Sequence, residues 1–215
     1  IFSVFAFAII TIVYCWPILD GDKINQSDYK QFLGMSKEIV DFRSEHGEEA
    51  LWTNSMFGGM PAYQISVHYA NNILVQIDQF FQLYLPRPVG IIFLYFIGFY
   101  ILLLSMRLNP HFAFLGALAF GFSTYLFIII EVGHNTKAHA IAYIAPSLAG
   151  MVHCFRQENN SLSKKIFGFF LSFLFLGLHL RGNHLQITYY FLFILFAFWV
   201  HYLIHAIKMN QNTNF

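Results

Sequence analysis

Residues 88–106 read PVGIIFLYFIGFYILLLSM, a run without a single acidic or basic side chain. A helix needs about 20 mostly apolar residues to cross the hydrocarbon core of a bilayer. This run comes close to that length, and phenylalanine, isoleucine, leucine and tyrosine fill most of it. It therefore predicts a transmembrane helix.

Similar apolar runs on either side of it predict further spans. They are residues 1–19, 111–130, 138–155, 166–180 and 187–207. The run 138–155 is the most polar, because it contains Pro146, Ser147 and several alanines and glycines. Small residues let helices approach closely in lipid, and neighbouring helices can satisfy the carbonyl that a proline frees. We expect this helix in the interior of the bundle.

The composition of the whole chain agrees with a membrane protein. Hydrophobic residues make up 57% of it and charged residues only 11%, whereas a soluble domain carries about 25% charged residues. The net charge of +1 provides no basic field for nucleic acid, so no nucleic-acid partner is expected. The sequence predicts an all-α membrane protein with about six transmembrane helices, in a single transmembrane domain over residues 1–215.

The distribution of lysine and arginine predicts the orientation of these helices. If the first span runs outward, the inward-facing ends carry Arg107, Arg156, Lys164, Lys165 and Lys208. The short outward-facing turns then carry only Lys137 and Arg181. Cytoplasmic loops are enriched in lysine and arginine. We therefore expect a multi-pass inner-membrane protein whose polar turns lie on the extracytoplasmic face.

The expected first extracytoplasmic loop, residues 20–87, is long and acidic, and it holds nine of the eleven acidic residues. Apolar residues recur at threes and fours in Asp28–Glu45 and in Ala70–Leu85, which is the period of amphipathic helices. We expect the second of these to lie along the membrane surface. Because the chain begins inside an apolar run at Ile1, we expect its true start to be missing. Because the polar end Asn210–Phe215 stops without a domain boundary, we also expect the C-terminal part to be missing, so that the chain is an N-terminal fragment.

Four polar segments fall on this outer face once the topology is set from lysine and arginine alone. They are residues 20–28, 52–61, 133–139 and 181–186. Their convergence predicts a functional site there.

Asp28 is the first candidate for chemistry, because a carboxylate near the membrane can act as a general base or hold a divalent metal. The alternative is an aspartate favoured by the dipole at a helix start. Asp20 and Asp22 fit turn positions beside Gly21.

Five outer-face residues are candidates for binding an anionic headgroup such as a lipid phosphate. They are Lys137, Arg181, His134, His139 and His184. Arginine binds phosphate bidentately and lysine as a point charge. The alternative is that the two cations extend toward the headgroups of ordinary lipids. His134 and His139 are five residues apart and do not share a helix face, so the histidines alone predict no metal site.

Two further residues are candidates on weaker grounds. Glu131 lies at the end of a predicted span, where an acidic residue is a functional candidate, although it could pair with Lys137 or Arg181. Trp52, with Phe57 and Tyr63, could form a stacking platform for a sugar ring, but aromatic residues are common at membrane interfaces.

Several of these segments also resemble a known family. The motifs are QSD at residues 26–28, GMSKE at 34–38, WTNSMFGGMPAY at 52–63, GHNTKAHAIAY at 133–143 and GNHLQITYY at 182–190. They resemble YfhO-type membrane proteins, in the form seen in Bacteroidetes, along nearly the whole chain. Such proteins are similar to the C-type membrane glycosyltransferase superfamily.

The resemblance implies a multi-pass bundle, a polyprenyl-phosphate sugar as donor, and an acceptor on the outer face. It implies catalysis by an acidic residue of the first outer loop, which is Asp28 here, with Asp22 as the fallback. No cofactor is certain, and a divalent metal, Mg²⁺ or Mn²⁺, stays open. The alternatives are a transporter or flippase for a lipid-linked envelope precursor, or a non-catalytic membrane assembly protein.

Overall fold

The computed structural model describes residues 2–66, 72–156 and 161–212, and it is 76% helical. Four helical stretches in this part of the chain are long and apolar enough to cross a membrane. They are Pro110–Val132, Asn135–Phe155, Leu162–Arg181 and Leu185–Lys208. Two apolar helices are shorter, α1 (Phe2–Tyr14) and α5 (Val89–Ser105). The structure is therefore compatible with a multi-pass membrane protein.

Three of the apolar runs are divided into two helices each. The first run forms α1 and the short α2 (Trp16–Leu19), whose first turn contains Pro17, a residue that has no N–H to continue α1. The third run forms α6 (Pro110–Gly121) and α7 (Thr124–Val132). The fourth forms α8 (Asn135–Ala142) and α9 (Ile144–Phe155). Pro146 accounts for that last division, because it cannot donate a hydrogen bond to the carbonyl of Ala142.

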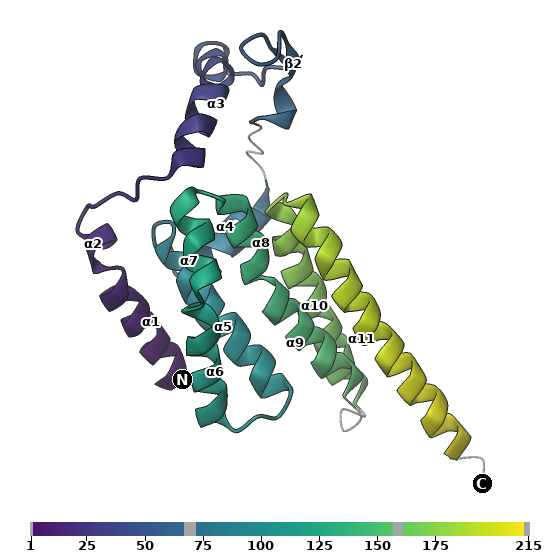
Figure 1. Ribbon diagram of the computed structural model, residues 1–215. Helices are drawn as coiled ribbons and strands as arrows, with labels where there is room; N and C mark the ends of the chain where they lie inside the picture. The colour runs from purple at the N-terminus through teal and green to yellow at the C-terminus, as the bar shows by residue number, and fades with distance from the viewer. Residues whose placement is uncertain (1, 67–71, 157–160, 213–215) are drawn as a thin grey trace.

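The last two runs form continuous helices, α10 (Leu162–Arg181) and α11 (Leu185–Asn212). Burial differs strongly between the spans. In α8–α9, 67% of the span is buried, against 6% in α11. The small residues of α9 thus occupy the interior of the bundle, as predicted, and α11 lies at its edge (Figure 1).

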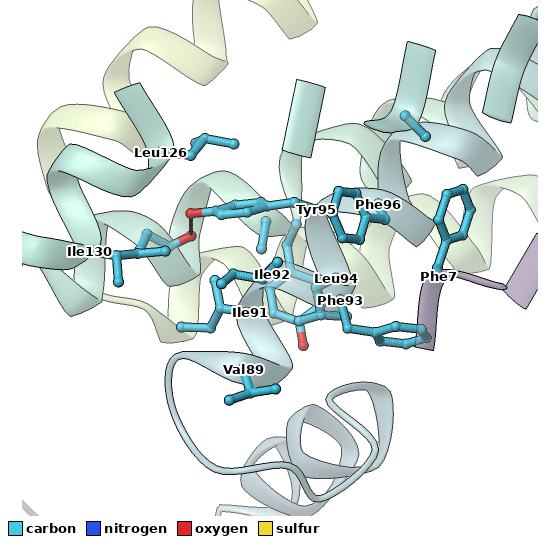
Figure 2. Packing of buried hydrophobic residues seen from close by; sticks show 14 of the residues in the cluster. Phe7, Val89, Ile91, Ile92, Phe93, Leu94, Tyr95, Phe96, Leu126 and Ile130 are labelled. Atoms are coloured by element: carbon cyan, nitrogen blue, oxygen red, sulfur yellow. Dashed lines mark hydrogen bonds between the residues drawn. The ribbon is translucent and has the colours of Figure 1, made fainter. Parts of the chain in front are cut away.

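The centre of the core is the N-terminal half of α5, where every residue from Val89 to Phe96 is buried. Figure 2 shows Phe7 of α1 beside Phe96, and their rings stack at 5.6 Å between centroids. The hydroxyl of Tyr95 donates a 2.9 Å hydrogen bond to the carbonyl of Ala138. This bond satisfies the one polar atom of a side chain that is otherwise enclosed.

The first part of the loop between α2 and α5 forms a lobe beyond one end of the bundle (Figure 1). It contains α3 (Ser27–His46), which Gly47 ends in a left-handed conformation at φ 70°. A short antiparallel hairpin follows, with β1 (Trp52–Thr53) and β2 (Met60–Pro61), and then the 3₁₀ turn η1 (Ala62–Gln64). The last helix before α5, α4 (Ile73–Phe81), packs against the bundle itself.

Candidate functional site

A buried carboxylate, Asp78, ties the loop to the bundle. Only 1% of Asp78 is exposed. Its Oδ2 accepts a hydrogen bond from Nη1 of Arg181 at 2.5 Å, and its Oδ1 lies 2.7 Å from Nε2 of His139. The hydroxyl of Tyr143 donates to the same Oδ1 at 2.6 Å. We call Asp78, His139, Tyr143 and Arg181 the inner set.

The environment of Asp78 keeps it ionised. Burial alone would raise its pKa, but His139, Tyr143 and Arg181 outweigh burial and lower the pKa to about 2. A buried carboxylate with three partners of this kind is therefore a charged group at neutral pH. Its charge is balanced by Arg181, whose side chain is 18% exposed.

His139 is enclosed as well as paired. Its Nδ1 is buried and has no hydrogen-bond partner among the described residues. A Cβ atom added at Gly182 would lie 3.0 Å from this nitrogen, so the glycine covers it closely. In this arrangement His139 and Arg181, both predicted to bind a ligand, instead bind Asp78.

The pairing of Asp78 was not predicted from the sequence, although a signal was present. Leu74, Ile77 and Phe81 form the face of α4 that packs against the core, and Asp78 lies four residues after Leu74 on that face. It is also the only charged residue in the predicted helix Ala70–Leu85. A lone carboxylate on the apolar face of a helix needs a buried cationic partner.

A second group of polar residues lies where α3 meets the turn between α7 and α8. Asp28 is in the first turn of α3, and its Oδ2 is 3.3 Å from Nδ1 of His134. Both side chains are partly exposed, at 41% and 44%. Gly133, at φ 104°, permits this approach, because a Cβ there would lie 3.0 Å from the backbone nitrogen of Tyr29.

Gln26 joins the same two elements. Its side-chain amide donates to the carbonyl of Ile130 at 2.5 Å, and it exchanges hydrogen bonds of 3.3 Å with the side-chain amide of Asn135. These bonds hold the start of α3 on the α7–α8 turn and thereby fix the position of Asp28.

Lys137 and His184 complete this second group. The pKa of His184 is lowered, first by burial and then by the positive charge of Lys137. His134 contributes in the same direction. Three of the four predicted polar segments are thus linked, by the Asp28–His134 contact and by the charges of Lys137 and His134 that act on His184, and we call Asp28, His134, Lys137 and His184 the outer set.

The remaining candidates, Asp22, Glu131 and Trp52, belong to neither set. Asp22 is exposed between α2 and α3, and Glu131 is exposed near the end of α7. In the described part of the chain, no ion pair joins Glu131 to Lys137 or Arg181. Trp52 is on the hairpin, where one face of its indole ring covers Gly59 and 56% of the residue is exposed.

The hairpin is held against α3 by Glu38. The carboxylate accepts hydrogen bonds from the hydroxyl of Thr53 and from the backbone N–H groups of Asn54 and Ser55. These bonds, that of Thr53 first, lower the pKa of Glu38 to about 2. The hairpin is therefore fully attached to α3 at pH values above the ordinary pKa of glutamate, and this attachment is lost as the pH falls through about 2.

Replacing Glu38 with alanine is expected to release the hairpin, because three donors lose their shared acceptor. Chymotrypsin should then cleave after the exposed Trp52 and Phe57 several times faster than in the unchanged chain. Glu45→Ala, on the same exposed helix, is the control. Equal cleavage rates for the two variants would contradict the role given to Glu38.

A metal site does not emerge from these residues. In the described ranges, no three side chains of histidine, cysteine, aspartate or glutamate are grouped so that they could hold a metal ion. Asp28 and His134 supply two donors, and their neighbour Lys137 is a cation. The donor set does not fit Mg²⁺ or Mn²⁺, which prefer several oxygen ligands.

No protein-family model, curated protein or solved structure matches the chain. Its function is therefore inferred from the two sets of residues and from the helices that hold them.

Proposed function

We propose that this chain belongs to a YfhO-type membrane glycosyltransferase of the C-type superfamily. It would transfer a sugar from a polyprenyl-phosphate donor to an acceptor at the extracytoplasmic face of the bacterial inner membrane. In this proposal α1–α2 and α5 also cross the bilayer, which makes six crossings with the four longer stretches. The single observation that carries the proposal is the Asp28–His134 pair of the outer set, a partly exposed carboxylate 3.3 Å from an imidazole that precedes α8, the helix of Lys137.

Asp28 is the general base of the proposed reaction. Its carboxylate takes the proton from the acceptor hydroxyl, and the acceptor oxygen bonds to the anomeric carbon of the sugar. The bond from that carbon to the phosphate oxygen breaks, and polyprenyl phosphate leaves with the electron pair. Attack opposite the leaving group inverts the anomeric configuration. His134, 3.3 Å from Asp28, orients the carboxylate.

Lys137 provides the positive charge for the leaving phosphate, where negative charge grows in the transition state. His184, whose pKa is lowered by burial and by Lys137, is the neutral neighbour of that cation. Arg181 and His139 act as positioning residues in this proposal. Through Asp78 they hold together the turns that carry Lys137 and His184.

The test uses the full-length protein and its Asp28→Asn variant, reconstituted in lipid. Each is incubated with radiolabelled polyprenyl-phosphate sugars and a membrane lipid extract, with and without a chelator. The unchanged protein should transfer label to a new product, and the variant should lose at least about 100-fold in rate, the lower range for loss of a general base.

Asp41→Asn is the matched control, because Asp41 is an exposed carboxylate on the same helix, paired with Lys37. Equal transfer by Asp28→Asn and Asp41→Asn would show that Asp28 is not the base. Loss in Asp22→Asn alone would assign that role to Asp22. Absence of transfer from every donor would favour a transporter or an assembly protein.

A further inference from the structure

A cleft of about 620 Å³ lies beside the outer set and has no role in the reaction as described above. It is formed where the end of α2 and the following loop face the first turns of α3 and the Arg87–Pro88 segment. Gln26 and Asn135, the amide pair that fixes Asp28, also line it.

The cleft carries an excess of positive charge. Lys23, Lys30 and Arg87 line it, and Asp22 is its one acidic residue among those described. The three cations are exposed, and none of them forms an ion pair in the described part of the chain. Elsewhere in the lobe the cations do have acidic partners, as in Lys37–Asp41 and Arg43–Glu49. Three unpaired cations around one cleft suit an anion with several oxygen acceptors.

Apolar residues line the same cleft. Ile18 of α2 and Leu33 of α3 are on its wall together with the buried Pro88, which precedes α5. Pro88 is the residue before α5, and Ile18 belongs to α2, which follows α1 in the chain. Cations next to apolar side chains at the ends of apolar helices match a molecule with a charged head and an apolar chain.

We propose that this cleft binds the phosphate group of an anionic membrane lipid through Lys23, Lys30 and Arg87. Arg87 can bind two phosphate oxygens at once, and the lysines supply point charges. Resting on the proposed function, we assign this lipid as the acceptor, since Asp28 lies between the cleft-lining Gln26 and Tyr29 in the sequence. The lipid would then carry a free hydroxyl on its headgroup, as phosphatidylglycerol does.

The test measures binding by calorimetry on the full-length protein in nanodiscs of zwitterionic lipid, without a sugar donor. The probes are short-chain phosphatidylglycerol, glycerol phosphate and short-chain phosphatidylcholine. Phosphatidylglycerol should bind, and phosphatidylcholine should not. The variant Lys23→Gln/Lys30→Gln/Arg87→Gln should bind phosphatidylglycerol roughly tenfold or more weakly, because it loses charge-assisted hydrogen bonds.

The matched control is Lys37→Gln/Lys164→Gln/Lys165→Gln, which removes the same charge outside the cleft and should bind as the unchanged protein does. Equal weakening in both variants would overturn the proposal, since attraction would then depend only on total charge. If glycerol phosphate binds as tightly as phosphatidylglycerol, the proposal that the phosphate belongs to a lipid is overturned. The single variants Lys23→Gln and Lys30→Gln, each expected to weaken binding, apply if the triple variant does not fold.

Binding and transfer fail separately in these experiments. Asp28→Asn should still bind phosphatidylglycerol, because Asp28 supplies no charge to the cleft. Binding without any sugar transfer would leave the lipid site intact and reject the glycosyltransferase. If the triple cleft variant transfers sugar as fast as the unchanged protein, the proposed glycosyltransferase activity stands and the cleft is rejected as its acceptor site.

Discussion

Replacing Asp78 with alanine is expected to destabilise the protein by about 3–5 kcal/mol, the usual effect of breaking a buried ion pair. Asp78 is 1% exposed and bonds to His139, Tyr143 and Arg181 at 2.5–2.7 Å. Alanine would leave the guanidinium of Arg181 partly buried without its counter-charge. The measurement is the thermal midpoint in detergent, together with proteolysis of the segment around α4, which should become accessible first.

Asp41→Ala is the control for this prediction. Asp41 also pairs with a cation at 2.5 Å, but its side chain is 51% exposed and that of Lys37 is 72% exposed. An exposed pair of this kind contributes about 0–1 kcal/mol. The double variant Asp78→Leu/Arg181→Met should recover part of the stability that Asp78→Ala loses, since no buried charge then remains. Equal destabilisation by Asp78→Ala and Asp41→Ala would contradict the structural role of the inner set.

Replacing Gly150 with valine is expected to separate α9 from α10 and to destabilise the protein by about 1–3 kcal/mol or more. A Cβ at Gly150 would lie 2.4 Å from the backbone nitrogen of Ser172 and 2.8 Å from the carbonyl oxygen of Gly168. Backbone atoms cannot move aside as flexible side chains do. The same crossing holds two reciprocal 3.0 Å hydrogen bonds between the hydroxyls and carbonyls of Ser147 and Ser172.

Gly177→Val on α10 is the matched control, because a Cβ there would meet only Leu74, at 3.9 Å. It should lower the thermal midpoint much less than Gly150→Val. The reaction of Cys154 with a maleimide provides a local readout. The backbone of Cys154 faces Gly168 across the same crossing, and separating the helices should expose its thiol. Equal effects of the two valines on stability and on labelling would contradict close packing at this crossing.

Much of the helical organisation could be predicted from the sequence, because length and hydropathy are properties of single segments. The run 138–155 was expected in the interior, and its small residues do lie there against α5 and α10. The division of the third run was not expected. It falls at Phe122–Ser123, where no proline marks it and where Gly121 packs against the ring of Phe96. That contact depends on a distant segment, so a local pattern does not reveal it.

The candidate site was predictable in part for the same reason. The predicted topology places Asp28 on the same face as the turns that hold His134 and His184, and in the structure Asp28 contacts His134 at 3.3 Å. The hydrogen-bond partners of each residue depend on tertiary packing. Arg181 was predicted to bind phosphate, and only the three-dimensional structure shows that it pairs with the buried carboxylate of Asp78.

The bond between Asp78 and Arg181 also has a consequence for biosynthesis. The two residues are 103 positions apart in the chain. At a synthesis rate of roughly 5–20 residues per second, Asp78 would leave the ribosome about 5–20 s before its partner. During that interval α4 holds an ionised carboxylate on its apolar face without a counter-charge. The loop can therefore dock permanently only after α10 is made, which orders the assembly of this protein in time.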